Sequence, residues 1–294
     1  MRPKRHQRRF PPQPRRVARP LRVSVVKYLN TAPLIWGLER GRPRRYQLNY
    51  TVPATCAEEL RSGQADVGII PAIEYQSIPG LKIIPHVAIA SERKVESVLL
   101  VSRGPARQAK RVALDASSRT SVALAKILFA RQWRREPDYV EAEPDLAAML
   151  EQADAALLIG DPALRFYLHA PGTKLGPIPN LHIYDLGEEW WRMTHLPFVY
   201  AFWAVRAAVV QAPQERQALT RAFCEARDAG LAHLKEIAQE AAPRLNLSGG
   251  QLERYLRSTI DYRLDAPHRS GLECFFRFAR ELGLIEEVRP LEFL

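Results

Sequence analysis

The chain has 294 residues, of which 47% are hydrophobic and 26% are charged. This composition is typical of a globular protein long enough for two domains, so a wholly disordered chain is excluded. The formal net charge of +11 has an uneven source, because residues 23–294 carry only +2. The other nine charges come from basic residues that lie before Val23 with no acidic residue among them: Arg2, Lys4, Arg5, Arg8, Arg9, Arg15, Arg16, Arg19 and Arg22.

Residues 1–20 are rich in arginine and proline and are predicted to form a disordered tail, with residues 1–22 dispensable for activity. A contact of this tail with an anionic surface or a nucleic acid is the minor alternative. No apolar core follows its paired arginines, so a secretory signal is not predicted. Because the body is nearly neutral, we expect no nucleic-acid partner.

The longest apolar stretch, residues 196–205, is too short for a bilayer span of roughly 20 residues, so no membrane partner is expected. Cys56, Cys224 and Cys274 form no Cys-x-x-Cys pair and are odd in number. This pattern favours free thiols in a reducing compartment, and we predict a cytoplasmic protein. The sequence does not indicate the oligomeric state.

Predicted strands and helices alternate along the chain up to residue 206, and the remainder is mostly helical. The strands are predicted at residues 21–26, 46–52, 65–70, 82–90, 97–102, 111–114, 138–141, 155–159, 182–185 and 198–205. The helices are predicted at residues 31–40, 55–63, 118–134, 144–152, 162–167, 188–194, 214–240, 248–258 and 269–284. Thr55 and Glu58 have the spacing of a capping box at the start of the second helix. The pattern predicts an α/β fold with mainly parallel sheets.

Two segments of the chain resemble each other. Residues 64–75 and 152–167 each contain a helix end, an Ala-Asp step, an apolar strand and a turn into a new helix. Chance can produce one such match in an α/β protein. The alternative is a pair of similar lobes that present strand ends, at Pro71 and Gly160, to a shared cleft, where ligands of open α/β sheets bind.

Motifs for the common cofactors are missing from the sequence. No phosphate-binding loop of nucleotide hydrolases, no Gly-rich dinucleotide motif and no His-Glu-x-x-His occurs in the chain. We therefore predict no cofactor and no metal site.

One hydroxyl-rich segment is predicted to bind an anion. Residues 115–121 follow a strand and open a helix, and they place Ser118, Arg119, Thr120 and Ser121 around its first turn. The unpaired N–H groups and the dipole of a helix start favour anions. Ordinary helix capping explains one of these hydroxyls but not the whole cluster.

Other polar residues lie at predicted strand ends. Tyr28 and Asn30 follow the first strand, Ser97 begins an apolar strand, and Asp161 follows Gly160. Asn30 is equally consistent with a loop residue that bonds its own backbone and with a ligand-binding amide. Ser97 is also consistent with a satisfied strand serine, and Asp161 with a helix cap.

Six ordered motifs together resemble the chorismate dehydratases of menaquinone biosynthesis, the MqnA family. They start at Ser24, Ala65, Ser97, Ser117, Leu158 and Leu196: SVVKYLNTAPL, ADVGIIPAIEY, SVLLVS, SSRTS, LIGD and LPFVYAFWA. The resemblance runs from about Leu21 to beyond Trp203. The helical C-terminal third matches in type only, and the tail lies outside the family pattern.

The resemblance implies a two-lobed fold similar to the type II periplasmic solute-binding proteins. One lobe would comprise residues 21–100 and 207–294, and the other residues 101–206. The implied activity is elimination of water from chorismate, a small dicarboxylate, to give 3-[(1-carboxyvinyl)oxy]benzoate in the futalosine route to menaquinone. The implied enzyme is a carbon–oxygen lyase that needs no cofactor. By the same resemblance, Asn30 and Ser97 are catalytic.

The resemblance further implies that residues 118–121 hold a substrate carboxylate, with Tyr28, Pro71, Gly160 and Asp161 also at the substrate. Asp161 is the more plausibly structural of these. Two other functions share the fold. A solute-binding protein for transport would need a signal or lipid anchor, and the sibling dihydroxynaphthoate synthase of the same pathway carries a histidine motif that is not visible in this sequence.

Overall fold

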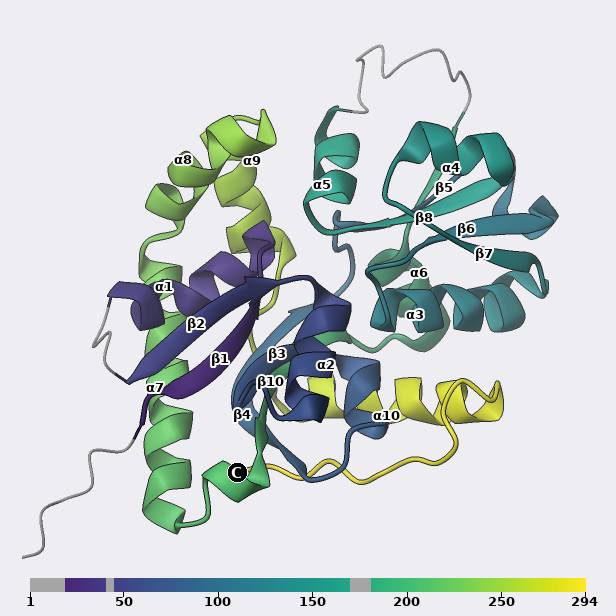
Figure 1. Ribbon diagram of the computed structural model, residues 1–294. Coiled ribbons are helices and arrows are strands. Elements are labelled where there is room, and N and C mark those ends of the chain that lie inside the picture. Colours follow the sequence, from purple (N-terminus) through teal and green to yellow (C-terminus); the bar gives the residue numbers. More distant parts are fainter. Residues whose placement is uncertain (1–18, 41–44, 170–180) are drawn as a thin grey trace, which may run out of the picture.

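The computed structural model describes residues 19–40, 45–169 and 181–294 and contains two five-stranded sheets (Figure 1). The strands are β1 (Leu21–Val26), β2 (Tyr46–Thr51), β3 (Val67–Pro71), β4 (Leu81–Ser91), β5 (Val98–Ser102), β6 (Arg111–Asp115), β7 (Asp138–Ala142), β8 (Ala155–Ile159), β9 (His182–Asp185) and β10 (Phe198–Arg206). The predicted α/β fold is therefore confirmed.

The α-helices are α1 (Ala32–Arg40), α2 (Pro53–Ser62), α3 (Thr120–Leu128), α4 (Leu146–Gln152), α5 (Gly160–His169), α6 (Leu186–Thr194), α7 (Pro213–Ala232), α8 (Leu234–Leu245), α9 (Gly249–Arg254) and α10 (Ala266–Glu281). Shorter helical turns relevant to the site are η1 (Leu29–Thr31), η2 (Ala72–Gln76), η4 (Phe129–Trp133) and η6 (Tyr255–Thr259). None of the helices in the described part of the chain is long and apolar enough to cross a membrane.

The two sheets have the same topology. Their strand orders are β2-β1-β3-β10-β4 and β7-β6-β8-β5-β9, and in each sheet only the fourth strand runs antiparallel to its neighbours. The similar segments 64–75 and 152–167 contain β3 and β8, which hold the same central position in their sheets. The carboxyl ends of the parallel strands therefore lie at corresponding edges of both sheets.

The antiparallel strands, β5 and β10, are the first strands that the chain forms after it passes from one sheet to the other. β4 in the first sheet leads to β5 in the second, and β9 in the second is followed by α6 and then β10 in the first. The division between the sheets thus differs from the expected boundaries at 100/101 and 206/207, because β5 and β10 each belong to the sheet that the chain has just entered. We refer below to residues 19–91 and 198–294 as lobe I, to 98–194 as lobe II and to 92–97 as the crossing segment.

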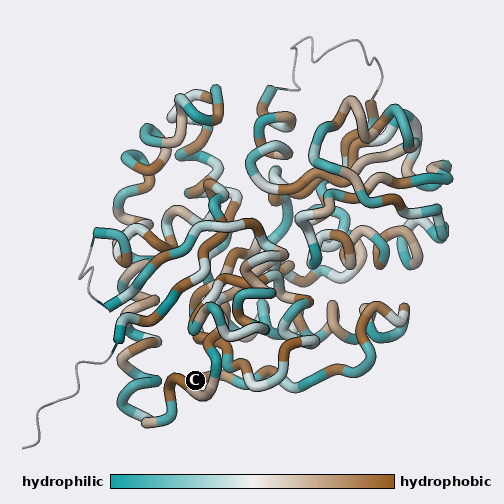
Figure 2. Tube along the Cα trace, in the orientation of Figure 1, coloured by the Kyte–Doolittle hydropathy of each residue, from teal (hydrophilic) through white to brown (hydrophobic). Residues whose placement is uncertain are grey.

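Burial of the central strands explains why the sequence predicts them as apolar runs. Every residue of β3, β5 and β8 is buried, as expected for strands covered on both faces, and Figure 2 shows hydrophobic colour along the strands inside both lobes. The edge strand β2 instead alternates between half-buried and exposed residues.

Two departures from the predicted helices have a clear structural form. The helix α2 begins at Pro53 rather than at the Thr55 capping box, because proline is favoured in the first turn of a helix, where its missing N–H costs nothing. The single helix predicted at residues 214–240 is two helices, α7 and α8, which meet at His233.

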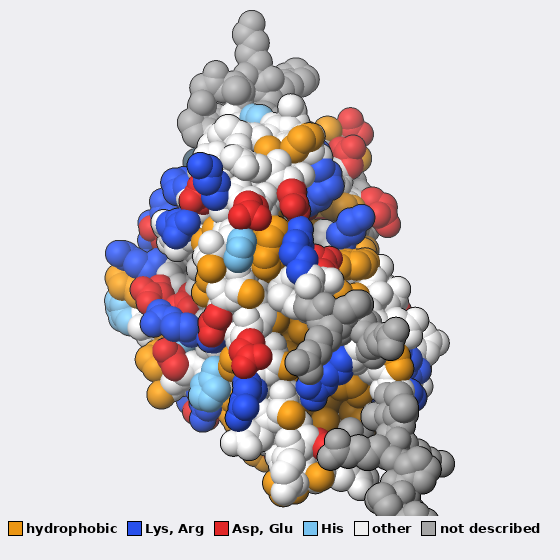
Figure 3. All heavy atoms as spheres, turned by 90° about the vertical axis from the view of Figure 1, so that its left-hand side faces the viewer, with side chains coloured by type: hydrophobic (Ala, Val, Ile, Leu, Met, Phe, Trp, Pro, Cys, Tyr) orange, Lys and Arg blue, Asp and Glu red, His pale blue; other side chains and the backbone are white. Residues whose placement is uncertain are grey.

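Charges on the surface are mixed in sign. Figure 3 shows basic and acidic side chains interspersed over the face that lies on the left of Figure 1, where α1, α7 and α8 are found. This face has no gathering of one sign of charge.

The boundary of the N-terminal tail needs correction. Residues 1–18 lie outside the described residues, but Arg19 and Arg22 donate hydrogen bonds of 2.7–3.2 Å to the carboxylate of Asp66, whose side chain is fully buried. Arg22 also lies within β1. The segment from Arg19 to Arg22 therefore makes structural contacts within lobe I and is not part of a disordered tail.

The arginine contacts predict an acid-sensitive contribution to stability. Burial opposes ionisation of Asp66, but the hydrogen bonds from Arg19 and Arg22 outweigh it and hold the pKa of this carboxyl well below its ordinary value. We expect Asp66→Asn to lower the free energy of unfolding by about 2 kcal/mol at pH 7, since it removes a buried carboxylate that two partly exposed arginines pair with.

Because the pKa of Asp66 is lower in the folded than in the unfolded chain, its stabilisation is present above the ordinary pKa and is lost as the pH falls. Denaturant titrations of both proteins at pH 7 and pH 3 check this. Asp138→Asn, at an exposed position, is the control. A difference between Asp66→Asn and the original chain that is as large at pH 3 as at pH 7 contradicts the assignment.

Candidate active site

A cavity lies between the two lobes, at the carboxyl ends of β1, β3 and β8 and at the start of α3. It is a narrow cavity that is partly open to solvent and is lined by residues of both lobes. Nine of the ten residues predicted for the site line it: Tyr28, Asn30, Pro71, Ser97, Ser118, Arg119, Thr120, Ser121 and Gly160.

Tyr28 and Gly160 form a tight contact between the lobes. Gly160 has a φ of +62°, which L-residues with a side chain rarely adopt, and a Cβ atom there would lie 2.7 Å from the ring of Tyr28. The backbone N–H of Gly160 donates a 2.8 Å hydrogen bond to the carbonyl of Ser97. Glycine at position 160 thus lets the Tyr28 ring close over the end of β8.

The hydroxyl-rich segment forms the start of α3, as predicted. Arg119 is the N-cap residue, and the first N–H groups of the helix lie at Thr120 and Ser121, both of which are buried residues that line the cavity. Ser118 is also buried there. Unpaired N–H groups and hydroxyls at a helix start favour a carboxylate.

Two members of this segment also join the lobes. The Thr120 hydroxyl accepts a 3.2 Å hydrogen bond from the N–H of Ile73 in lobe I. The Arg119 guanidinium donates to the carbonyl oxygens of Ala116 and Ser118 and lies 3.7 Å from the Glu74 carboxylate. Its charge is therefore partly committed to protein groups.

Asn30 and Ser97 lie together at one end of the cavity. Ser97 is buried, and its hydroxyl accepts a 2.8 Å hydrogen bond from the hydroxyl of Tyr255, which is also buried. The Asn30 side chain lies close enough to affect the ionisation of the same phenol. The two residues predicted to be catalytic thus converge on one tyrosine.

Asp161 lies beside the cavity but outside its wall. Its carboxylate accepts a 2.8 Å hydrogen bond from the N–H of Leu29 and a 2.6 Å bond from Arg244 of α8. The prediction that Asp161 contacts substrate is not supported by this placement, because both oxygens are already engaged with lobe I. The sequence suggests a helix cap for Asp161, but its carboxylate instead joins lobe II to lobe I through these two contacts.

The charge of the wall is informative. Among the described residues, Arg119 is the only lining residue with a charged side chain, and no carboxylate, lysine or histidine faces the cavity. Burial raises the pKa of Tyr28 and of Tyr200, both lining residues, so their phenols stay protonated. The described wall therefore offers hydrogen-bond donors and acceptors but no general base.

The crossing segment is held from both lobes. In lobe II, the Asp185 carboxylate accepts hydrogen bonds of 2.7–3.1 Å from the N–H groups of Val95 and Glu96. From lobe I, the Arg254 guanidinium donates two 3.0 Å bonds to Glu96, whose φ is +58°. These contacts fix the backbone immediately before Ser97.

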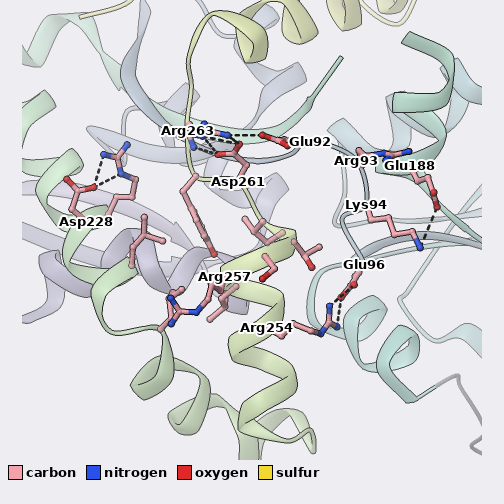
Figure 4. Close-up of a pocket in the computed structure, with 18 residues that line it drawn as sticks. Glu92, Arg93, Lys94, Glu96, Glu188, Asp228, Arg254, Arg257, Asp261 and Arg263 are labelled. Atoms are coloured by element: carbon pink, nitrogen blue, oxygen red, sulfur yellow. Dashed lines mark hydrogen bonds and ion pairs between the residues drawn. The ribbon is translucent and has the colours of Figure 1, made fainter. Parts of the chain in front are cut away.

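A second and wider hollow lies around the crossing segment (Figure 4). Its labelled basic side chains are largely matched to acidic ones: Lys94 to Glu188, Arg254 to Glu96 and Arg263 to Glu92 and Asp261. Six basic and five acidic side chains line this hollow, so most of its positive charge is compensated by neighbouring carboxylates.

Two tyrosines at or beside the cavity are not among the residues predicted for the site. Tyr200 lies in β10, within the motif that begins at Leu196, and strand alternation could have indicated it. Tyr255 lies in η6 of the helical C-terminal third, where no motif signals a site. Within the described residues, no group of three or more His, Cys, Asp or Glu side chains is placed to hold a metal ion.

Comparison with known proteins agrees with the predicted fold and family. A family model described as menaquinone biosynthesis matches residues 21–281. A chorismate dehydratase from Thermus thermophilus is 34% identical over 277 residues, which cover 90% of this chain and 96% of the relative.

Solved structures show the same fold at low sequence identity. A protein from Archaeoglobus fulgidus superposes with a TM-score of 0.71 at 17% identity, covering 90% of this chain and 98% of that one. The periplasmic aliphatic sulphonate binding protein from Escherichia coli gives a TM-score of 0.64 at 17% identity, covering 94% of each chain. The predicted two-lobed, periplasmic-binding-protein-like fold is confirmed.

The Tyr28–Gly160 contact predicts a test of lobe closure. In Gly160→Ala, the added methyl group displaces the Tyr28 ring, so we expect a larger radius of gyration by small-angle X-ray scattering as the lobes separate. Gly80→Ala is the matched control, because Gly80 also has a positive φ of +71° but no atom within 4 Å of the added Cβ. Equal radii for Gly160→Ala and the original chain argue against this contact as a determinant of closure.

Proposed function

This chain belongs to the menaquinone-biosynthesis family whose model it matches, and from that premise we propose that it eliminates water from chorismate to give 3-[(1-carboxyvinyl)oxy]benzoate. The observation that carries the proposal is the character of the cavity, whose described wall has hydroxyl and amide groups and a helix start but no general base. That wall suits a substrate that brings its own negative charges.

Chorismate has two carboxylates, and the start of α3 is the site for one of them. The N–H groups of Thr120 and Ser121 and the buried Ser118 hydroxyl stabilise a carboxylate through hydrogen bonds and the helix dipole. Binding of this carboxylate places the ring toward Asn30 and Ser97, the proposed catalytic residues at the other side of the cavity.

The reaction removes the hydrogen at C3 and the hydroxyl at C4 of the ring. The enolpyruvyl carboxylate of the substrate takes the C3 proton, the C3–H electron pair forms the new ring double bond, and the C4–O bond breaks. The departing hydroxide then takes the proton from the carboxylic acid and leaves as water. Aromatisation provides the driving force, so the reaction is that of a cofactor-independent carbon–oxygen lyase.

Protein groups act on this reaction by position rather than by proton transfer. The Ser97 hydroxyl donates a hydrogen bond to the leaving oxygen, and the Asn30 amide orients the enolpyruvyl group. Residues such as Val26, Ile69 and Ile159 pack the apolar part of the cavity, where hydrogen bonds to the reacting groups are stronger than in water.

A cytoplasmic location is part of the proposal. Cys56, Cys224 and Cys274 are all free thiols, as expected in a reducing compartment. The only partner that the cavity requires is the small dicarboxylate substrate.

Purified protein and chorismate test the function directly. We expect chorismate to be consumed with no added cofactor or metal, and the aromatic enolpyruvyl ether to accumulate in equal amount, as measured by liquid chromatography and proton NMR. Chorismate that binds, as measured by calorimetry, but is not consumed would instead identify a solute-binding protein of the same fold.

The site assignment predicts different outcomes for two substitutions. Asn30→Asp places a carboxylate next to a dianionic substrate, so we expect kcat to fall by at least about 100-fold. Asp161→Asn removes the ion pair with Arg244 but keeps an oxygen that can accept from Leu29, so kcat should stay within about threefold and KM should rise. Near-complete loss of kcat in Asp161→Asn with unchanged binding of the product would overturn this division of roles.

A further inference from the structure

Tyr255 contacts the Ser97 hydroxyl, and Tyr255 itself is not part of the cavity wall. It is the first residue of the π-helical turn η6, which follows α9 in lobe I, and π-helical turns occur often at functional sites. Its hydroxyl donates to Ser97 across 158 positions of sequence, and each of the two residues is only 1% exposed. This bond therefore joins two buried side chains from distant parts of the chain.

Neighbouring residues repeat the connection. Arg254 binds Glu96 and Tyr255 binds Ser97, so two consecutive residues of the helical segment hold two consecutive residues of the crossing segment. Figure 4 shows the first of these contacts, where the Arg254 guanidinium meets the Glu96 carboxylate. The ion pair and the buried hydroxyl pair therefore lie side by side between the same two segments.

The Tyr255 hydroxyl donates its hydrogen bond to the Ser97 oxygen. Burial raises the pKa of Tyr255 well above its ordinary value, and the opposing effects of the Ser97 and Asn30 side chains are smaller. The phenol is therefore protonated at neutral pH and can serve as this donor. Because Ser97 accepts the hydrogen bond, its single hydroxyl proton remains to be donated elsewhere.

No residue in the described part of the chain accepts the Ser97 proton, and Ser97 lines the cavity. Without the Tyr255 bond, the Ser97 hydroxyl could rotate freely and would point either its proton or a lone pair toward a ligand. Once one lone pair is occupied by Tyr255, the proton is confined to the remaining directions, which include the cavity.

We propose that Tyr255 is a positioning residue that orients the Ser97 hydroxyl as a hydrogen-bond donor toward the leaving oxygen of the substrate. This role rests on the proposed dehydratase function. Tyr255 itself does not touch the substrate, because it is absent from the lining of the cavity in the described chain. Its effect is carried by Ser97 alone.

Tyr255→Phe tests the role in the full-length protein. A single net hydrogen bond corresponds to about a three- to tenfold change in rate, so we expect kcat for chorismate to fall by that factor while KM stays within about twofold. In a Ser97→Ala background the same substitution should change kcat by less than about twofold, since the hydroxyl that Tyr255 orients is gone. A merely structural tyrosine would lower the rate by the same factor in both backgrounds.

Two further variants make the result decisive. Tyr262→Phe is the matched control, because Tyr262 is a neighbouring buried tyrosine whose hydroxyl has no hydrogen-bond partner in the described part of the structure. It should leave kcat unchanged. Tyr255→3-fluorotyrosine keeps the hydroxyl and should restore most of the rate, which also excludes misfolding as the cause of the loss in Tyr255→Phe.

Unchanged kcat in Tyr255→Phe, or equal losses with and without the Ser97 hydroxyl, would overturn the proposed role. The failure of the underlying function looks different. If the original chain does not consume chorismate, the dehydratase activity is rejected, and the role of Tyr255 in it falls as well. If the original chain is active and Ser97→Ala is equally active, the placement of Ser97 in the reaction is wrong.

Discussion

The crossing segment between β4 and β5 is held by charge from both lobes, and the geometry of the site depends on it. Asp185 in lobe II accepts from backbone N–H groups of the segment, and Arg254 in lobe I pairs with Glu96, which has a left-handed backbone conformation. A non-glycine residue with positive φ costs free energy and persists where its surroundings compensate. At Glu96 the two hydrogen bonds from Arg254 compensate for this cost. The next residue, Ser97, lines the cavity.

The contacts between the lobes around the cavity satisfy buried backbone groups that need hydrogen-bond partners. The N–H of Leu29 finds Asp161, and the N–H of Ile73 finds Thr120. Both donors belong to lobe I and both acceptors to lobe II. The lobes therefore satisfy each other's backbone groups when they meet, and the glycine at position 160 leaves room for Tyr28 at the same junction.

Apart from Arg119, the described wall of the cavity offers neutral hydrogen-bond donors to an ionic substrate. A basic cluster would bind a dianion more strongly, but it would also stabilise the carboxylate that has to accept a proton and so lower its basicity. Hydroxyls, an amide and a helix start hold the substrate, and one of its carboxylates stays basic enough to accept the C3 proton. This explains how a wall without a general base suits an elimination reaction.

Much of the site could be predicted because its residues follow strand ends in recognisable patterns. Asn30, Ser97 and the residues at the start of α3 are adjacent to apolar strands, and the sequence therefore locates them at one edge of a sheet. Contacts made by side chains over long sequence separations could not be predicted. Three contacts have no local signal in the sequence: the hydrogen bond from Tyr255 to Ser97, the ion pair of Asp161 with Arg244 and the ion pair of Asp66 with Arg19.

The lobe boundaries were misplaced for a related reason. An apolar strand has the same sequence pattern whether it belongs to one sheet or to the other, so residues 97–102 and 198–205 were predicted as strands correctly but could not be assigned to their sheets. Sheet membership is decided by pairing with distant strands: β5 pairs with β8 and β9, and β10 with β3 and β4.

The central claim is that the substrate supplies the base, and a modified substrate tests it most directly. Chorismate esterified with methanol at its enolpyruvyl carboxylate keeps the ring, the C4 hydroxyl and the ring carboxylate, but its ester group cannot accept the C3 proton effectively. Measured at saturating concentration, the rate of aromatisation of this ester by the purified protein should be below detection although the ester still binds. Aromatisation at a rate close to that of chorismate would show that the protein contains the base and would contradict the account.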